Sequence, residues 1–258
     1  MYLAKSIAAS GLRNQMLRID TIANNISNAN TTAYKNARLD FKDSLYTAGI
    51  TPGPARSQNE SQQKGHGVIA AAVTRDFKPG ALTRTERMLD FAIENEGFFS
   101  LSDHNGDIVY TRNGSFHISV ENGTTYLVNG EGLYVLDENE ERIQIPFGTD
   151  TINVNNNGEL TFINNDVVTG NATLGIFTFR NLKGLEAAGH GNYSPSPAAG
   201  ERLEAENAVV RQGVLEGSNL NLADEMSRLI RTQRAFQLVS RALTTADEMQ
   251  GIANNMRR

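Results

Sequence analysis

The chain has 258 residues, 39% of them hydrophobic, and a formal net charge of −5. This length suits one large or two ordinary domains, and this hydrophobic content can bury a core, so a chain disordered throughout is excluded. The mild charge and the absence of a Lys/Arg run argue against a nucleic-acid-binding protein.

The charge is unevenly distributed. Residues 1–50 hold six basic and three acidic side chains, and residues 211–258 hold seven and five, so the two ends carry +3 and +2. Subtracting both from the total of −5 leaves −10 for residues 51–210. There is no cysteine, so a disulfide framework and thiolate chemistry are excluded.

The first element is expected to be a helix that ends near residue 27. Its apolar residues recur at alternating intervals of four and three, as in a heptad helix: Leu12, Met16, Ile19, Ala23 and Ile26. The stretch "NANTTAYK" (28–35) follows. Asparagine competes for backbone hydrogen bonds and threonine is a weak helix former, so we predict a non-helical turn there. An ordinary helix end with solvated amides is the simpler interpretation.

Residues 36–85 are expected to form a long loop or extended connecting segment. Its most polar part, residues 48–67, has two prolines, four glycines and three glutamines with almost no apolar side chain.

Short apolar runs such as "FFSLS", "IVYTR" and "TYLVN" then predict an antiparallel β domain over residues 86–190. Asn-Gly, the dipeptide that most readily reverses a chain with positive φ at both residues, occurs five times, beginning at residues 105, 113, 122, 129 and 157. Residues 191–212 are expected to be a return connection.

The last element is expected to be a helix over about residues 220–256, roughly 55 Å long. One apolar line continues the heptad spacing: Ala235, Val239, Ala242, Ala246, Met249, Ala253 and Met256. A second line lies beside it: Leu222, Met226, Leu229, Phe236 and Leu243. The two terminal helices could pack on the β domain. The width of this apolar face instead favours pairing with each other and with neighbouring molecules.

The predicted fold class is therefore α+β. The terminal helices, residues 1–35 and 213–258, form a coiled-coil-like domain paired internally and with neighbouring subunits, and the central domain is mainly antiparallel β.

Two terminal signatures resemble those of the flagellar rod and hook family of bacterial axial proteins. The stretch "ANNISNANTTAYK" (23–35) is similar to the family's N-terminal pattern, although Ala33 stands where the family usually has glycine. If that position needs positive φ, alanine costs about 1 kcal/mol. The stretch "GVLEGSNLNLADEMSRLIRTQRAFQLVSRALTTADEM" (213–249) is similar to the C-terminal pattern, and "DFAIENEGFF" (90–99) and "YTRNGSF" (110–116) resemble the family's β-domain core.

This resemblance implies a structural subunit whose terminal helices pack, copy on copy, into a tubular drive shaft with the β domain outside. The implied packing residues in the N-terminal signature are Ala23, Asn24, Asn25, Ile26, Asn28, Thr31, Thr32, Tyr34 and Lys35. Those in the C-terminal helix are Asn219, Asn221, Leu222, Met226, Leu229, Gln233, Arg234, Phe236, Val239, Leu243 and Met249. Both ends are expected to be disordered in the monomer and to fold on assembly.

Within the family, the chain length points to the rod proteins. Residues 48–67 and 184–200 look more like those of the distal rod subunit, and "GVLEGSN" (213–219) leaves the proximal subunit as the alternative. The implied partners are further copies, other rod subunits, the hook subunit, the flagellar type III export apparatus and surrounding ring proteins. The implied location is the flagellar basal body outside the cytoplasmic membrane. The first residues lack the apolar core of a secretory signal, and no apolar run reaches the ~20 residues of a membrane span, so neither a cleavable signal peptide nor membrane insertion is expected.

We expect no enzymatic activity, no bound metal ion and no cofactor. The four histidines, His66, His104, His117 and His190, are scattered and form no zinc motif. The remaining alternative is a carbohydrate- or peptidoglycan-binding β domain on oligomerising helices. The absence of tryptophan, a usual platform for a sugar ring, argues against it.

Overall fold

The computed structural model describes residues 2–44, 46–48, 63–65, 67–103, 106–205 and 207–256. The chain forms two compact units. The helical unit comprises residues 1–27, 37–76 and 221–258, and the β unit comprises residues 28–36 and 77–220. Of the polar stretch 48–67, residues 49–62 and 66 lie outside the described part.

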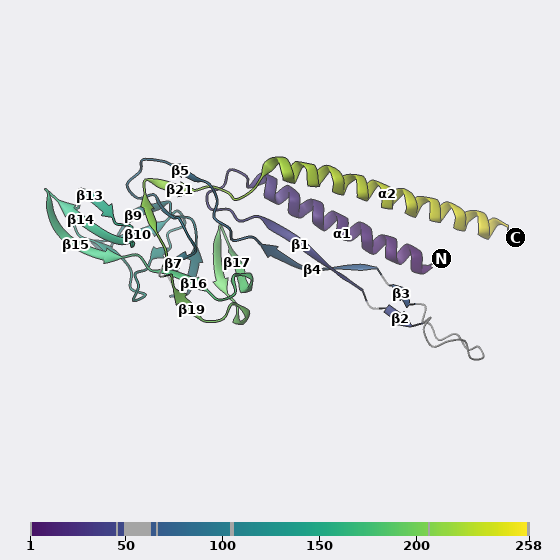
Figure 1. Cartoon of the computed structure of the whole chain (residues 1–258), viewed down its shortest axis with the longest axis horizontal. Coiled ribbons are helices and arrows are strands. Elements are labelled where there is room, and N and C mark those ends of the chain that lie inside the picture. Colours follow the sequence, from purple (N-terminus) through teal and green to yellow (C-terminus); the bar gives the residue numbers. More distant parts are fainter. Residues whose placement is uncertain are drawn as a thin grey trace. The chain divides into compact units, whose positions relative to one another are not determined.

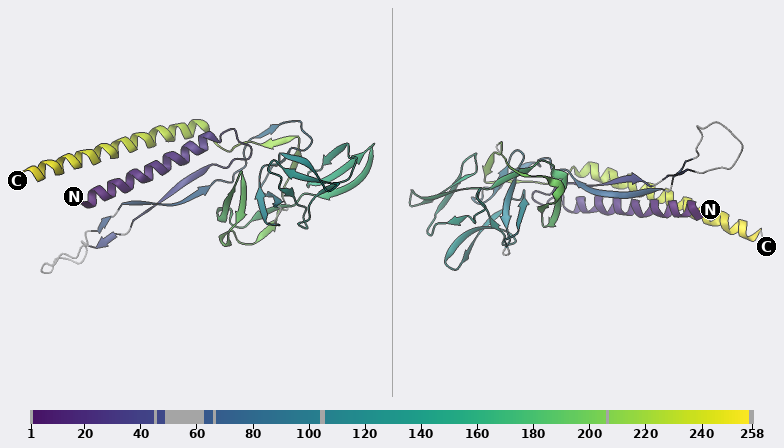
Figure 2. Two further views of the ribbon diagram at one scale, coloured as in Figure 1. Left: turned by 180° about the vertical axis from the view of Figure 1, so that it is seen from behind. Right: turned by 90° about the horizontal axis from the view of Figure 1, so that it is seen from below.

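Two long helices dominate the helical unit. Helix α1 spans Tyr2–Ser27 and helix α2 spans Leu222–Asn255, and they lie side by side and run antiparallel (Figures 1 and 2). The Asn221 side chain caps α2 by accepting hydrogen bonds from the backbone N–H groups of Ala223 (3.1 Å) and Asp224 (3.3 Å). The acidic first turn of α2 favours the same start, since carboxylates interact well with a helix N-terminus. The expected α+β class and both terminal helices are confirmed.

A two-stranded antiparallel ribbon completes the helical unit. Strand β1 (Ala37–Asp43) pairs with β4 (Val68–Arg75), with a register shift between Asp40 and Phe41. The ribbon contacts α1, where the Ser10 hydroxyl donates to the carbonyl of Val68 over 2.9 Å. Strands β2 (Tyr46–Ala48) and β3 (Gln63–Gly65) form a further pair. The segment expected to be a connection thus holds paired strands and belongs to the helical unit as far as residue 76.

The β unit is built almost entirely from antiparallel strands. A ten-stranded sheet follows the order β12-β10-β11-β7-β8-β18-β17, with β9 beside β10 and with β16 joining β7 to β19. A three-stranded sheet has the order β13-β14-β15, and two smaller pairs join β20 to β6 and β21 to β5. The bounds are β5 Leu82–Arg84, β6 Phe91–Ile93, β7 Phe98–Ser102, β8 Ile108–Thr111, β9 Phe116–Glu121, β10 Thr124–Asn129, β11 Tyr134–Val135, β12 Gln144–Ile145, β13 Thr151–Val154, β14 Glu159–Asn164, β15 Val167–Thr173, β16 Ile176–Phe179, β17 Leu185–Gly189, β18 Asn192–Pro195, β19 Arg202–Glu204, β20 Val210–Gln212 and β21 Val214–Glu216, with 3₁₀ turns at Leu182–Gly184 and Pro197–Ala199.

The β unit extends beyond the expected range of 86–190. Residues 191–212, expected to be a return connection, supply strands β18, β19 and β20. These strands are short, and their apolar residues are few, which is why hydrophobic alternation did not reveal them.

The four described Asn-Gly pairs differ in geometry. Asn122 and Gly123 have φ of 51° and 83° and form the tight turn between β9 and β10, as expected for a two-residue hairpin loop. The other three pairs do not have positive φ at both residues. The prediction of positive φ at both residues therefore holds for one described pair.

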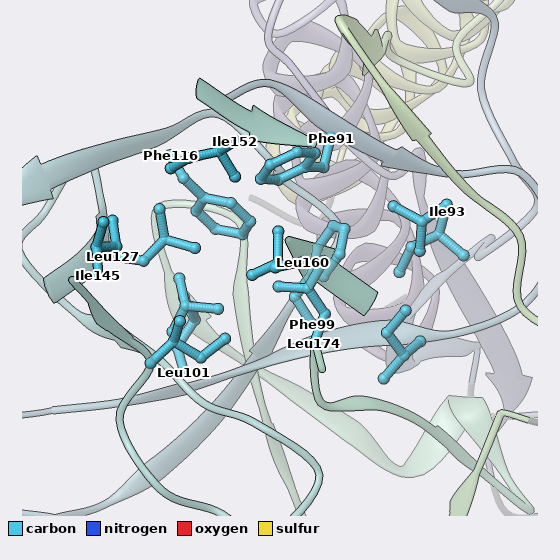
Figure 3. Packing of buried hydrophobic residues seen from close by; sticks show 14 of the residues in the cluster. Phe91, Ile93, Phe99, Leu101, Phe116, Leu127, Ile145, Ile152, Leu160 and Leu174 are labelled. Atoms are coloured by element: carbon cyan, nitrogen blue, oxygen red, sulfur yellow. The ribbon is translucent and has the colours of Figure 1, made fainter. Parts of the chain in front are cut away.

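The main core lies inside the β unit, where the Phe116 ring packs against the rings of Phe91 and Phe99 (Figure 3). The Phe99 and Phe116 rings meet edge to face with centroids 5.3 Å apart, and Phe91 lies 6.0 Å from Phe116. Backbone also packs tightly here: a Cβ on Gly114 would lie 1.9 Å from the carbonyl oxygen of Phe91. A second buried cluster is mainly aromatic and contains Phe98, Tyr110, Phe177, Phe179 and Tyr193.

Candidate functional site

The N-terminal signature ends in a tight turn that belongs to the β unit. The Thr31 N–H donates to the carbonyl of Asn28 over 3.1 Å, so the chain turns immediately after α1. Ala33 has φ of 55° and is buried, and its N–H donates to the carbonyl of Glu216 over 2.7 Å. The position where the family usually has glycine therefore does adopt positive φ, at the cost expected for alanine.

A fully buried group of three charged side chains lies beside this turn. We call Lys35, Arg112 and Glu216 the buried charge cluster. Lys35 Nζ lies 2.6 Å from one carboxylate oxygen of Glu216, and Arg112 Nε lies 2.7 Å from the other. The three residues come from the N-terminal signature, the turn after β8 and the end of β21, and their side chains are at most 3% exposed.

Hydrogen bonds to the backbone complete this cluster. Lys35 also donates to the carbonyl of Lys78 over 2.7 Å. The guanidinium of Arg112 donates to the carbonyls of Ile93, Asn95 and Gly97 over 2.7–3.0 Å. Glu216 accepts a further bond from the N–H of Gly80 over 2.7 Å. Buried charges are tolerated when they are paired and hydrogen-bonded in this way.

The electrostatics of the cluster favour an ionised Glu216. Burial by itself would raise the pKa of this carboxyl, but the charges of Arg112 and Lys35 and the hydrogen bonds from Lys35 and Gly80 outweigh it, so the pKa of Glu216 lies below its ordinary value. The cluster has two cations and one carboxylate, and the excess positive charge faces the carbonyl groups that surround Arg112.

Asn219 joins the two signatures directly. Its side-chain oxygen accepts from the N–H of Asn36 over 2.8 Å, and its amide donates to the carbonyl of Lys78 over 3.1 Å. An amide can donate and accept at once, which explains why asparagine suits this position. The structure thus brings Lys35 and Asn219, predicted from separate motifs, to one place.

In the helical unit, Asn25 has the equivalent role. It is 1% exposed, and its side chain bonds both the N–H (3.0 Å) and the carbonyl (2.8 Å) of Ala37 at the start of β1. Its amide also lies 3.4 Å from a carboxylate oxygen of Glu225, which is buried in the first turn of α2. One asparagine therefore links α1, β1 and α2.

The covered face of α2 does not correspond to either of the two apolar lines expected from the sequence. A run of buried and half-buried positions repeats at intervals of four and three, and we call it the inner seam: Glu225, Leu229, Thr232, Phe236, Val239, Leu243, Ala246 and Gln250. It mixes residues from both expected lines. Because α1 and α2 lie side by side, this seam is the face of α2 that the unit itself covers.

A second set of apolar residues lies on the far side of α2, spread among exposed polar residues such as Arg234 and Arg241, since successive residues are about 100° apart around a helix. We call it the outer row: Met226, Ile230, Leu238, Met249, Ile252 and Met256, which are 48–79% exposed. Several large apolar side chains left exposed on one side of a helix are typical of a surface that binds another molecule.

The other predicted packing residues are partly or fully exposed. Half-buried positions are Ile26, Asn28, Thr32 and Tyr34. Exposed positions are Ala23, Asn24, Thr31, Asn221, Leu222, Gln233 and Arg234. Their role in packing between subunits remains a prediction. Sequence reasoning did not single out Arg112 or Glu216 as site residues, although both lie in stretches that carry the resemblance.

Among the described residues, no group of three or more acidic or histidine side chains could hold a metal ion. None of the described helices is long and apolar enough to cross a membrane.

Comparison with protein families gives three matches along the chain. Residues 6–35 match the family described as flagella basal body rod protein, and residues 92–162 match the D1 domain of flagellar hook protein FlgE/F/G. Residues 211–256 match the C-terminal family of the flagellar basal body rod FlgEFG proteins. The first and third matches contain the two signatures that meet at the buried charge cluster.

Comparison with individual proteins extends this similarity to the full length. The chain is 35% identical to the flagellar basal-body rod protein FlgG of Borreliella burgdorferi, over 97% of both chains. It is also 35% identical to FlgG of Agrobacterium fabrum, over 97% of this chain and 98% of that one. The flagellar hook-basal body complex protein FlhP of Bacillus subtilis is 32% identical over 99% of this chain and its own full length. With both signatures and the β domain matched in order, the chain belongs to the family of flagellar basal-body rod proteins.

Proposed function

We propose that this chain is the distal rod subunit of the flagellum, a structural protein that polymerises through its terminal helices into a rigid shaft and transmits torque from the motor to the hook. The outer row of α2 is the observation that carries this proposal, because the helical unit leaves its six large apolar side chains exposed. The full-length similarity to proteins named FlgG favours the distal subunit over the proximal one and over a carbohydrate-binding domain.

The mechanical part of the proposal follows from packing. Side-by-side helices with interdigitated side chains form a dense, barely compressible core, so a tube of many such pairs resists bending and twisting. The inner seam would hold each pair together, and the outer row would hold pairs to one another. The proposed partners are other copies, other rod subunits, the hook subunit, the flagellar type III export apparatus and surrounding ring proteins.

The proposed location is the flagellar basal body outside the cytoplasmic membrane.

Assembly of the purified full-length chain tests the proposal. Leu238→Asp places a charge in the outer row at a position that is 66% exposed. The monomeric variant should therefore keep the circular dichroism spectrum of the monomeric parent, while its sedimentable, filamentous fraction falls at least about tenfold. Ile118→Asp makes the same change at an apolar position of β9 that is 49% exposed, and it should assemble like the parent. Equal assembly of the parent and Leu238→Asp would refute the role of the outer row.

A further inference from the structure

The Asn-Gly pairs of the β unit carry a chemistry of their own, apart from their use in turns. The backbone nitrogen of the glycine can attack the side-chain carbonyl carbon of the preceding asparagine. A C–N bond forms, the attacking nitrogen loses its proton and the side-chain amide leaves as ammonia, which closes a succinimide ring. Water then opens the ring at either carbonyl and gives aspartate or isoaspartate. Glycine favours this reaction because it has no Cβ to hinder the attack.

The fold decides which pair can react. The asparagine side chain must be free to turn toward the glycine nitrogen, that nitrogen must be free of a hydrogen bond, and water must reach both groups. The pair at Asn113 does not meet these conditions, because the Asn113 side-chain oxygen accepts from the N–H of Ser115 over 3.2 Å. Gly114 is also buried, with the carbonyl oxygen of Phe91 only 1.9 Å from where a Cβ would lie. Attack at this position is therefore blocked.

Two further pairs are held in place by hydrogen bonds. The side-chain oxygen of Asn129 accepts from the backbone N–H groups of Glu131 and Leu133, both over 2.9 Å. In the last pair along the chain, the attacking nitrogen is occupied instead, because the N–H of Gly158 donates to the carbonyl of Asn155 over 3.1 Å and Gly158 is buried. In each case one reacting group is committed to another partner, so the ring cannot close without first breaking a hydrogen bond.

The pair Asn122-Gly123 meets all three conditions. Both residues are exposed at the tip of the β9–β10 hairpin. Within the described part of the chain, neither the Asn122 side chain nor the N–H of Gly123 has a hydrogen-bond partner. No heavy atom outside the neighbouring residues lies within 4 Å of where a Cβ on Gly123 would be, so nothing hinders the approach of the two groups or of water.

We infer that Asn122 is a site of spontaneous deamidation in the folded chain, and that the fold suppresses the same reaction at the three other described pairs. The reaction needs only water, so it proceeds without an enzyme or a cofactor and its extent grows with the age of the molecule. This inference goes beyond the proposed function and does not depend on it.

The products change both the charge and the backbone of the hairpin. Either product adds one negative charge beside Glu121, which is already exposed at the tip. Isoaspartate also lengthens the main chain between residues 122 and 123 by one carbon atom. A two-residue loop with positive φ at both positions cannot absorb this extra atom, so the pairing of Glu121 with Thr124 across the loop should loosen.

Ageing of the full-length chain at neutral pH, followed by peptide mapping with mass spectrometry, tests the inference. Each peptide reports conversion of its Asn-Gly pair by the mass difference between –NH₂ and –OH, and electron-based fragmentation distinguishes isoaspartate from aspartate. Conversion at Asn122 should be at least about tenfold faster than at Asn113, Asn129 or Asn157. In guanidinium chloride, where the fold is lost, the four rates should come within about threefold of one another.

The variant Asn122→Asp is the matched control, because it carries the charge of the product on a normal backbone. It should release no ammonia from this position, and its other pairs should convert at the parent's rates. The aged parent should lose more stability to urea than Asn122→Asp does, since only the parent forms isoaspartate in the hairpin.

Two results would overturn the inference. One is conversion at Asn113, Asn129 or Asn157 as fast as at Asn122 in the folded chain, because the fold would then not discriminate among the pairs. The other is conversion at Asn122 at less than about one tenth of its rate in guanidinium chloride, because the hairpin would then protect it as well. Neither result bears on assembly, so the proposed function is tested separately.

Discussion

Replacing Glu216 by glutamine removes the only carboxylate from the buried charge cluster while keeping the size and shape of the side chain. Two cations then remain buried, Lys35 at 2.6 Å and Arg112 at 2.7 Å from the altered group. Removing one partner of a buried ion pair costs about 3–5 kcal/mol, because the remaining charge has neither solvent nor counter-charge. This is a large part of the about 5–15 kcal/mol that stabilises a typical domain.

The composition of the cluster predicts an asymmetry between its members. Glu216→Gln raises its formal charge from +1 to +2, whereas Lys35→Met lowers it to zero and leaves Arg112 paired with Glu216. The loss in Lys35→Met is then mainly the hydrogen bond to the carbonyl of Lys78, about 1–3 kcal/mol for an acceptor left unsatisfied. Glu216→Gln should therefore be the more destabilising of the two.

Urea unfolding of the full chain, followed by circular dichroism, measures these differences. With a slope of about 2 kcal/mol per molar urea, Glu216→Gln should lower the midpoint of the β unit by about 1.5–2.5 M. Glu94→Gln is the matched control, because Glu94 pairs with Arg211 at 2.9 Å with both side chains largely exposed, and it should shift the midpoint by less than about 0.5 M. The reasoning is refuted if Glu216→Gln shifts the midpoint no more than Glu94→Gln, or if Lys35→Met costs as much as Glu216→Gln.

Three further outcomes are expected. The pKa of Glu216 is lowered in the folded state, so the stabilisation by its carboxylate is present above about pH 4.3 and is lost as the pH falls through the folded pKa. Below about pH 4.3 the parent should therefore lose stability more steeply than Glu216→Gln does. Urea titrations at several pH values would show this difference. Gly114→Ala should destabilise by at least about 3 kcal/mol through its clash with the carbonyl of Phe91, whereas Gly130→Ala, with open space around it, should change the unfolding midpoint little. Asn25→Ala should lower the thermal stability of the helical unit by about 1–3 kcal/mol, measured by helical circular dichroism, and an unchanged melting curve would contradict its linking role.

The helices were predictable because their signal is local and long. The apolar spacing in both ends repeats over several turns, and Asn221 with the acidic residues after it marks the start of α2. The ribbon of β1 and β4 was not predicted, since its two strands pair across a long polar stretch. Residues 191–212 were missed as strands for a related reason: β19 and β20 are three residues long and take their order from partners distant in the sequence.

The candidate site was predictable only in part. The two signatures gave Lys35 and Asn219, but the partner of Lys35 lies 181 residues away and Arg112 lies 104 residues from Glu216. No local pattern reports contacts over such separations. A buried pair can nonetheless be suspected when a charged residue interrupts an apolar strand and its stretch otherwise resembles a folded core, as with Arg112 after "IVYT".

The outcome for α2 shows what a wide apolar face can and cannot reveal. From the sequence, Leu229, Phe236 and Leu243 formed one line and Val239 and Ala246 the other, yet all five lie on the inner seam. Two paired helices pack through a single seam, and on α2 this seam takes residues from both expected lines. Thr232 and Glu225 are buried on that seam because Thr232 bonds the carbonyl of Arg228 and Glu225 contacts Asn25 and Arg228.

The residues that remain, the outer row, then have no partner of their own within α1 and α2. Burial of apolar surface at roughly 25 cal/mol per Å² makes such a row a strong attraction between copies, but an attraction without direction, since one apolar row packs against another at many offsets. Charged contacts are directional, and a mismatch between them places like charges together. In this chain, therefore, the outer row would supply the strength of assembly, and charged contacts between copies would fix its register.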